Sequence, residues 1–132
     1  IKAKIANAFK AAATDKALLT RFRHVRTGTG VKAGQRYVEV DALFTPTAQQ
    51  ANRGCLIGKG IDRIGEPVKE VQLTQLFEAM ERAASKGEIL TLYAHGIAAS
   101  GKHHHLMPDT LEKILAHGQH LGLRFYGFDE LP

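Results

Sequence analysis

The sequence contains no tryptophan, only four prolines and a single cysteine among its 132 residues. Cys55, the single cysteine, cannot form an internal disulfide framework and cannot build a zinc site by itself. No apolar run approaches the roughly 18 residues of a transmembrane helix, and no secretory signal is expected. The net charge of +5 is not organised into a basic stripe or an aromatic platform. The chain is therefore not expected to bind nucleic acid.

Apolar residues make up 44% of the chain, which is enough for one domain with a hydrophobic core. Apolar spacing of the helical kind predicts helices over residues 1–13, 73–84 and 108–121. Short apolar or alternating runs predict extended segments at residues 18–25, 35–44, 56–57, 89–94 and 123–126. Residues 26–30 are expected to form a loop, because they contain two glycines. Helices that alternate with short strands predict an α/β fold with parallel strands.

The run ILTLYA at residues 89–94 predicts a strand, and His95 follows it directly. A histidine in this position projects from the C-terminal end of the strand. In parallel α/β folds the reacting groups collect at that edge of the sheet. A histidine that only hydrogen bonds to a loop carbonyl is the alternative.

Two other strings resemble functional motifs. Residues 58–65 contain a G-x-G pattern, but no helix follows it and the third glycine is out of register, so a dinucleotide site is not expected. Three consecutive histidines occupy positions 103–105. They are not expected to bind one metal ion, because neighbouring side chains of an extended segment point to opposite faces. The alternative is that one of the three faces a site near His95.

Residues 73–132 resemble the C-terminal part of the polysaccharide deacetylase (NodB-homology) family. The stretch LTLYAH at residues 90–95 is similar to the "L-x-H" element of the family, and it lies between two predicted helices. GLRFYGFDEL at residues 122–131 is similar to the pattern G-x-x-F-x-x-F-x-E-L. Upstream, FRHVRTG at residues 22–28 is similar to F-R-x-P-x-G. The resemblance covers most of the chain, with a poor match at residues 36–69.

The resemblance implies that residues 1–132 form the C-terminal portion of a deacetylase domain, which is a deformed (β/α) barrel with parallel strands alternating with helices. Such a domain binds a divalent metal ion, usually zinc, and hydrolyses acetyl groups from an acetylated glycan. His95 would be the general acid, and Arg23 would orient the catalytic aspartate, with Arg26 as the alternate. Arg26, Tyr93 and His105 would contact the substrate.

Several parts of the family pattern have no counterpart in this chain. The T-F-D-D strand and the H-[ST]-x-x-H pair are absent, and the motif that carries Asp and Trp is represented at best by Asp41 and Phe44. The metal ligands are therefore expected in an N-terminal half of the domain outside this chain, and the chain alone is not expected to hydrolyse a substrate. A divergent member without activity is the second explanation.

A non-catalytic carbohydrate-binding or protein-binding α/β module is the competing class of function. It explains the absent metal ligands without a further segment.

By family resemblance, a deacetylase of this kind is expected to be exported to the periplasm or the cell exterior.

Overall fold

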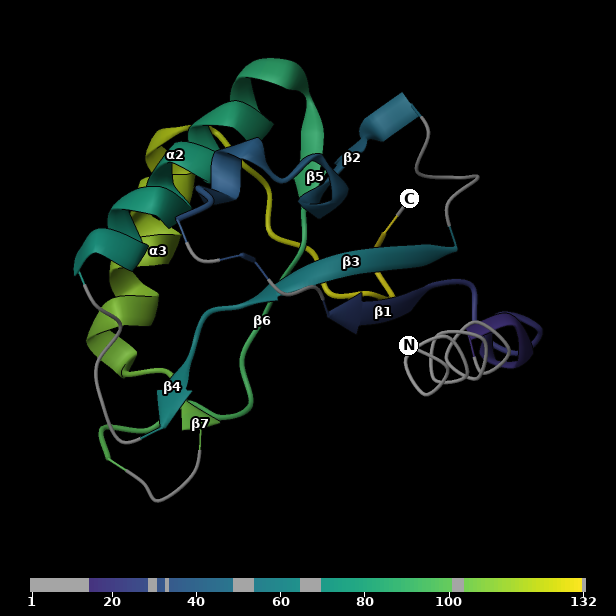
Figure 1. Ribbon diagram of the computed structural model, residues 1–132, viewed down its shortest axis with the longest axis horizontal. Helices are drawn as coiled ribbons and strands as arrows, with labels where there is room; N and C mark the ends of the chain where they lie inside the picture. Colours follow the sequence, from purple (N-terminus) through teal and green to yellow (C-terminus); the bar gives the residue numbers. More distant parts are fainter. Residues whose placement is uncertain are drawn as a thin grey trace.

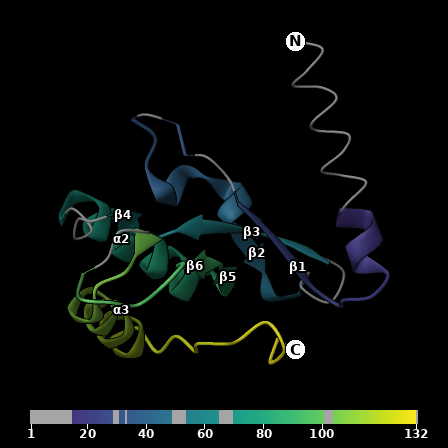
Figure 2. The ribbon, with the colours of Figure 1, turned by 90° about the horizontal axis from the view of Figure 1, so that it is seen from below.

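The structure is a computed structural model that describes residues 15–28, 31–32, 34–48, 54–64, 70–100 and 104–131 (Figure 1). The helix predicted over residues 1–13 lies outside the described residues. Residues 15–19 are helical and lie at one end of the molecule, and the two long helices lie at the other end (Figures 1 and 2).

A three-stranded parallel sheet forms the centre of the fold. Its strands are β1 (Val25–Gly28), β3 (Cys55–Gly60) and β6 (Leu92–Tyr93), in the order β1-β3-β6. Val25 is opposite Cys55, and Gly60 is opposite Tyr93. The predicted α/β class with parallel strands is confirmed, and the short apolar pair at residues 56–57 lies inside β3.

Two antiparallel strand pairs flank this sheet. In the first, β2 (Phe44–Pro46) pairs with β5 (Glu88–Leu90). In the second, β4 (Arg63–Ile64) pairs with β7 (His104–His105). The extended segment predicted over residues 89–94 therefore serves two sheets, because β5 pairs with β2 and β6 pairs with β3.

Two amphipathic helices pack side by side, α2 (Glu70–Lys86) and α3 (Pro108–His120) (Figure 1). As the sequence predicts, α3 begins with its proline, and Gly87 follows α2 with a φ of 63°. A positive φ at that position suits a glycine that ends a helix. The buried core cluster consists of Tyr37, Leu43, Phe44, Leu73, Leu76, Ala79, Met80, Ala83 and Ile114. Of the helices in the described ranges, none combines the length and the apolar character needed to cross a membrane.

Four local predictions are wrong. Residues 18–25 are not one extended segment, because the helical residues 15–19 reach into this range and β1 begins only at Val25. Residues 26–28 belong to β1 instead of a loop, because the glycine there is paired across the sheet with Gly58. Residues 35–44 contain two short 3-10 helices, η1 (Tyr37–Glu39) and η2 (Asp41–Leu43), in place of an extended segment. Residues 123–126 follow α3 as irregular chain without strand pairing. The alternating apolar residues at 35–44 indicate a segment that is buried on one side. Short 3-10 helices can bury one side as well as a strand can.

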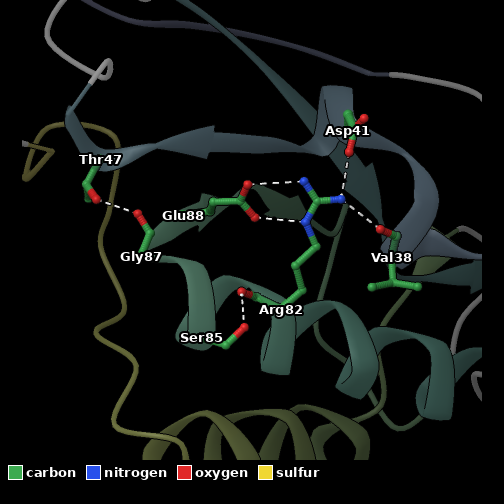
Figure 3. Close-up of polar contacts among 7 residues, drawn as sticks. All are labelled: Val38, Asp41, Thr47, Arg82, Ser85, Gly87 and Glu88. Atoms are coloured by element: carbon green, nitrogen blue, oxygen red, sulfur yellow. Dashed lines mark hydrogen bonds and ion pairs between the residues drawn. The ribbon is translucent and has the colours of Figure 1, made fainter.

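Arg82 of α2 connects the helix to two other parts of the fold (Figure 3). Its guanidinium makes two hydrogen bonds to the Glu88 carboxylate, at 2.8 and 3.1 Å. It also donates to the Val38 carbonyl and to the Asp41 carboxylate, each at 2.8 Å. The Arg82 and Glu88 side chains are only 12% and 11% exposed. Hydrogen bonding to Glu88 raises the pKa of Arg82, so the guanidinium stays charged.

Candidate functional site

Two polar side chains meet just beyond the C-terminal ends of neighbouring parallel strands. Asp62 lies two residues after β3, and His95 lies two residues after β6. Gly60 and Tyr93 are opposite each other in the sheet, so this register brings the two following loops together. Functional groups of parallel α/β sheets gather at this edge. The sequence-based placement of His95 beyond a strand end is confirmed.

The Asp62 carboxylate is bound to His95 in two ways. Its Oδ2 atom accepts a hydrogen bond from the His95 backbone N–H at 2.6 Å and lies 2.9 Å from the ring Nδ1. The Asp62 side chain is 2% exposed, whereas that of His95 is 61% exposed. A buried carboxylate thus holds a ring that remains open to solvent.

Burial and hydrogen bonding act on the Asp62 carboxyl in opposite directions. Burial raises its pKa, because it disfavours the charged form. The backbone and ring hydrogen bonds from His95 outweigh burial, so the pKa of Asp62 lies below its usual value. The carboxylate is therefore ionised at neutral pH and can fix the orientation of the imidazole.

His104 is the third member of the cluster. The β4–β7 pairing places His104 opposite Ile64, two residues after Asp62. The rings of His95 and His104 lie 5.0 Å apart between centroids. A backbone hydrogen bond from Leu106 to Gly96, at 2.7 Å, joins the segment that follows β7 to the loop of His95.

The metal ligands that the sequence analysis expects outside this chain have a candidate counterpart within it. Asp62, His95 and His104 each offer a ligand atom, and these atoms lie within 4.8 Å of one another. One carboxylate and two imidazoles form a donor set typical of hydrolytic zinc sites. The chemistry of these three side chains therefore fits a divalent ion.

Arg26 and Tyr93 form a stacked pair beside this cluster. The guanidinium carbon of Arg26 lies 3.9 Å from the centroid of the Tyr93 ring. The Tyr93 and His95 rings are 5.9 Å apart and meet edge to face. The central strand leaves room for the pair, because a Cβ atom at Gly58 would lie 3.1 Å from the Arg26 side chain and 3.2 Å from the Tyr93 ring.

The other predicted site residues lie elsewhere. Arg23 precedes β1, so it is at the N-terminal end of the sheet, opposite the edge that carries His95. His105 is buried at 6% exposure. The alternation of β7 places His104, and not His105, beside His95. This agrees with the prediction that consecutive histidines point to opposite faces. The resemblance assigns His105 to the substrate, whereas His104 is the histidine beside His95.

Asp62 is the functional candidate that the sequence alone does not reveal. It lies within the string at residues 58–65, whose glycines drew attention to nucleotide binding. The aspartate considered from the sequence, Asp41, is instead a surface partner of Arg82, with a side chain 90% exposed. The available signal is positional for His95, which directly follows a predicted strand, whereas Asp62 lies five residues beyond the predicted pair at residues 56–57.

Comparisons of the chain with models of protein families, with characterised proteins and with solved structures found no match. The assignment of function therefore depends on the site.

Proposed function

We propose that this protein hydrolyses acetyl groups from an acetylated sugar or polysaccharide. The observation that carries the proposal is the pairing of the buried Asp62 carboxylate with the exposed His95 ring. A carboxylate that orients an imidazole is an arrangement that recurs in acid–base catalysis. The parallel sheet with its helices supports a part of a (β/α) barrel as the surrounding fold.

In this mechanism Asp62 orients the imidazole of His95, and His95 transfers the proton. Asp62 holds Nδ1, which leaves Nε2 as the ring nitrogen for proton transfer. Nε2 takes a proton from a water molecule as that water adds to the acetyl carbonyl carbon, and the bond from that carbon to the sugar nitrogen or oxygen then breaks. His95 gives its proton to the departing sugar atom, and acetate is the second product.

The metal ion has two possible relations to His95. When bound, a divalent ion polarises the acetyl carbonyl and lowers the pKa of a water molecule. If Asp62, His95 and His104 hold this ion, His95 is a ligand and another group must donate the proton. If the ion is held elsewhere, His95 is the acid and His104 is only its neighbour. His104 therefore distinguishes the two assignments.

Replacement of His104 by alanine tests which assignment is correct. If the trio holds the ion, His104→Ala weakens binding of Co²⁺ by about 10-fold or more, because one of three ligands is lost. The measurement is titration with Co²⁺, followed by its visible absorption. His120→Ala, an exposed residue of α3, is the matched control and should leave Co²⁺ binding unchanged. Equal Co²⁺ binding by both variants would assign His95 to proton transfer alone.

The direct test of the proposal is release of acetate by the intact protein. Acetylated neutral and acidic glycans are offered with and without Zn²⁺ or Co²⁺, and acetate is measured over time. We expect acetate from at least one glycan in the presence of the metal ion. Glycan binding without acetate release under every condition would reject hydrolysis.

That second outcome would favour a carbohydrate-binding module, the alternative function. The observation that supports it is an apolar hollow of about 410 Å³ between α2, β5 and the end of the chain. Phe125, Tyr126 and Phe128 line it and are 50%, 46% and 37% exposed. Exposed aromatic side chains of this kind can pack against the apolar faces of sugar rings.

A further inference from the structure

The Arg26 guanidinium lies at the candidate site, and no carboxylate of the described residues forms an ion pair with it. Among the described residues, ion pairs form at Arg36, Arg82, His95 and His117, whereas the one contact recorded for Arg26 is with the Tyr93 ring. Its side chain is exposed. A guanidinium carries five N–H donors in one plane, and stacking on a ring leaves those donors free at the edge of that plane.

The surrounding strands fix the position of this cation. Arg26 belongs to β1, and its side chain crosses the central strand at Gly58 to reach Tyr93 of β6. Gly28 and Gly60 also approach the Tyr93 ring, where an added Cβ atom would lie 3.1 Å from its hydroxyl oxygen or from its ring. Three glycines thus keep this part of the sheet clear, and Arg26 and Tyr93 occupy the space.

The arrangement decides what kind of ligand group can bind. Arg26 covers one face of the Tyr93 ring, so a sugar that approaches this face meets the guanidinium first. A planar guanidinium that is pre-oriented by an aromatic ring pairs with an oxyanion through two parallel hydrogen bonds. Neutral sugar hydroxyls make weaker bonds to the same donors.

We propose that Arg26 binds an oxyanion on the substrate, so the preferred substrate is an acidic acetylated glycan. The oxyanion is a carboxylate of a uronic acid or a sulfate ester. This inference depends on the proposed function for the acetyl group, but the binding of the oxyanion does not. Tyr93 connects the two, because its ring contacts both Arg26 and His95.

The test compares three glycans in binding and in acetate release with the intact protein. They are an acetylated polyuronate, a sulfated acetylated glycan without uronic acid, and a neutral acetylated glycan. For the wild-type protein we expect the tightest binding with one of the two acidic glycans. Arg26→Gln should weaken that binding about 10-fold and leave the neutral glycan unchanged. The affinity of Arg26→Lys for the acidic glycan should lie between those of the wild-type protein and Arg26→Gln, because lysine keeps the charge and loses the planar guanidinium.

Arg21→Gln is the matched control, since Arg21 is also exposed but lies before β1, away from the edge of the sheet that carries His95. Thermal unfolding of each variant verifies that the fold is retained. Equal weakening for acidic and neutral glycans, or no change in Arg26→Gln, would overturn the oxyanion site. Binding that depends on Arg26 without acetate release would keep this inference and reject the proposed hydrolysis. Acetate release from neutral glycans, without a preference for acidic glycans, would keep the proposed hydrolysis and reject this inference.

Discussion

Replacing His95 by asparagine lowers the turnover number about 10²- to 10⁴-fold, the contribution typical of a positioned acid. The amide of asparagine can keep a donor near Asp62, where Nδ1 lies 2.9 Å from the carboxylate. It has no counterpart of Nε2 and cannot transfer a proton. KM is expected to change little, because the ring acts on the departing atom in the transition state. The measurement is steady-state acetate release by the intact protein.

Asp62→Asn provides the companion variant. The amide retains the size of the side chain and removes the negative charge that faces Nδ1. We expect a smaller loss of turnover than for His95→Asn, because the imidazole is still present but less well oriented. His120→Asn is the control for a general effect of removing a histidine. Wild-type turnover in His95→Asn would exclude His95 as both acid and metal ligand.

The second large effect concerns stability. Arg82→Met is expected to lower the free energy of unfolding by about 3 kcal/mol, because it leaves the Glu88 carboxylate without its partner. Glu88 is 11% exposed, so water replaces the lost hydrogen bonds poorly. The same substitution also removes the contacts to Val38 and Asp41 that connect α2 to the two 3-10 helices (Figure 3). The measurement is urea unfolding followed by circular dichroism.

A matched surface pair gives the control. Arg36 and Glu78 form a similar ion pair at 2.6 Å, but their side chains are 52% and 35% exposed. Arg36→Met should therefore cost much less than Arg82→Met, since water screens exposed ion pairs. The double variant Arg82→Met with Glu88→Met should recover part of the lost stability, because no unpaired buried charge remains. Equal effects of Arg82→Met and Arg36→Met would contradict the structural role of the Arg82 cluster.

Local patterns in the sequence predicted the helices most reliably. The apolar spacing of α2, the glycine that follows it and the proline that begins α3 each act through contacts within a few residues. The prediction for residues 26–28 was wrong because their structure depends on contacts with residues far away in the sequence. Gly28 is a loop signal by itself, but across β1 and β3 it leaves space for the Tyr93 ring.

The sequence by itself determined an α/β chain with parallel strands and a histidine beyond a strand end. It also determined that only one of two adjacent histidines in an extended segment can face a given site, because side chains alternate. Only the tertiary structure decided that this histidine is His104, that Asp62 is the partner of His95 and that Arg26 stacks on Tyr93. The physical reason is strand register, which brings Asp62 to His95 across 33 positions of sequence. Register depends on the pairing of whole strands, so the spacing within one strand does not by itself give the partner residue on another.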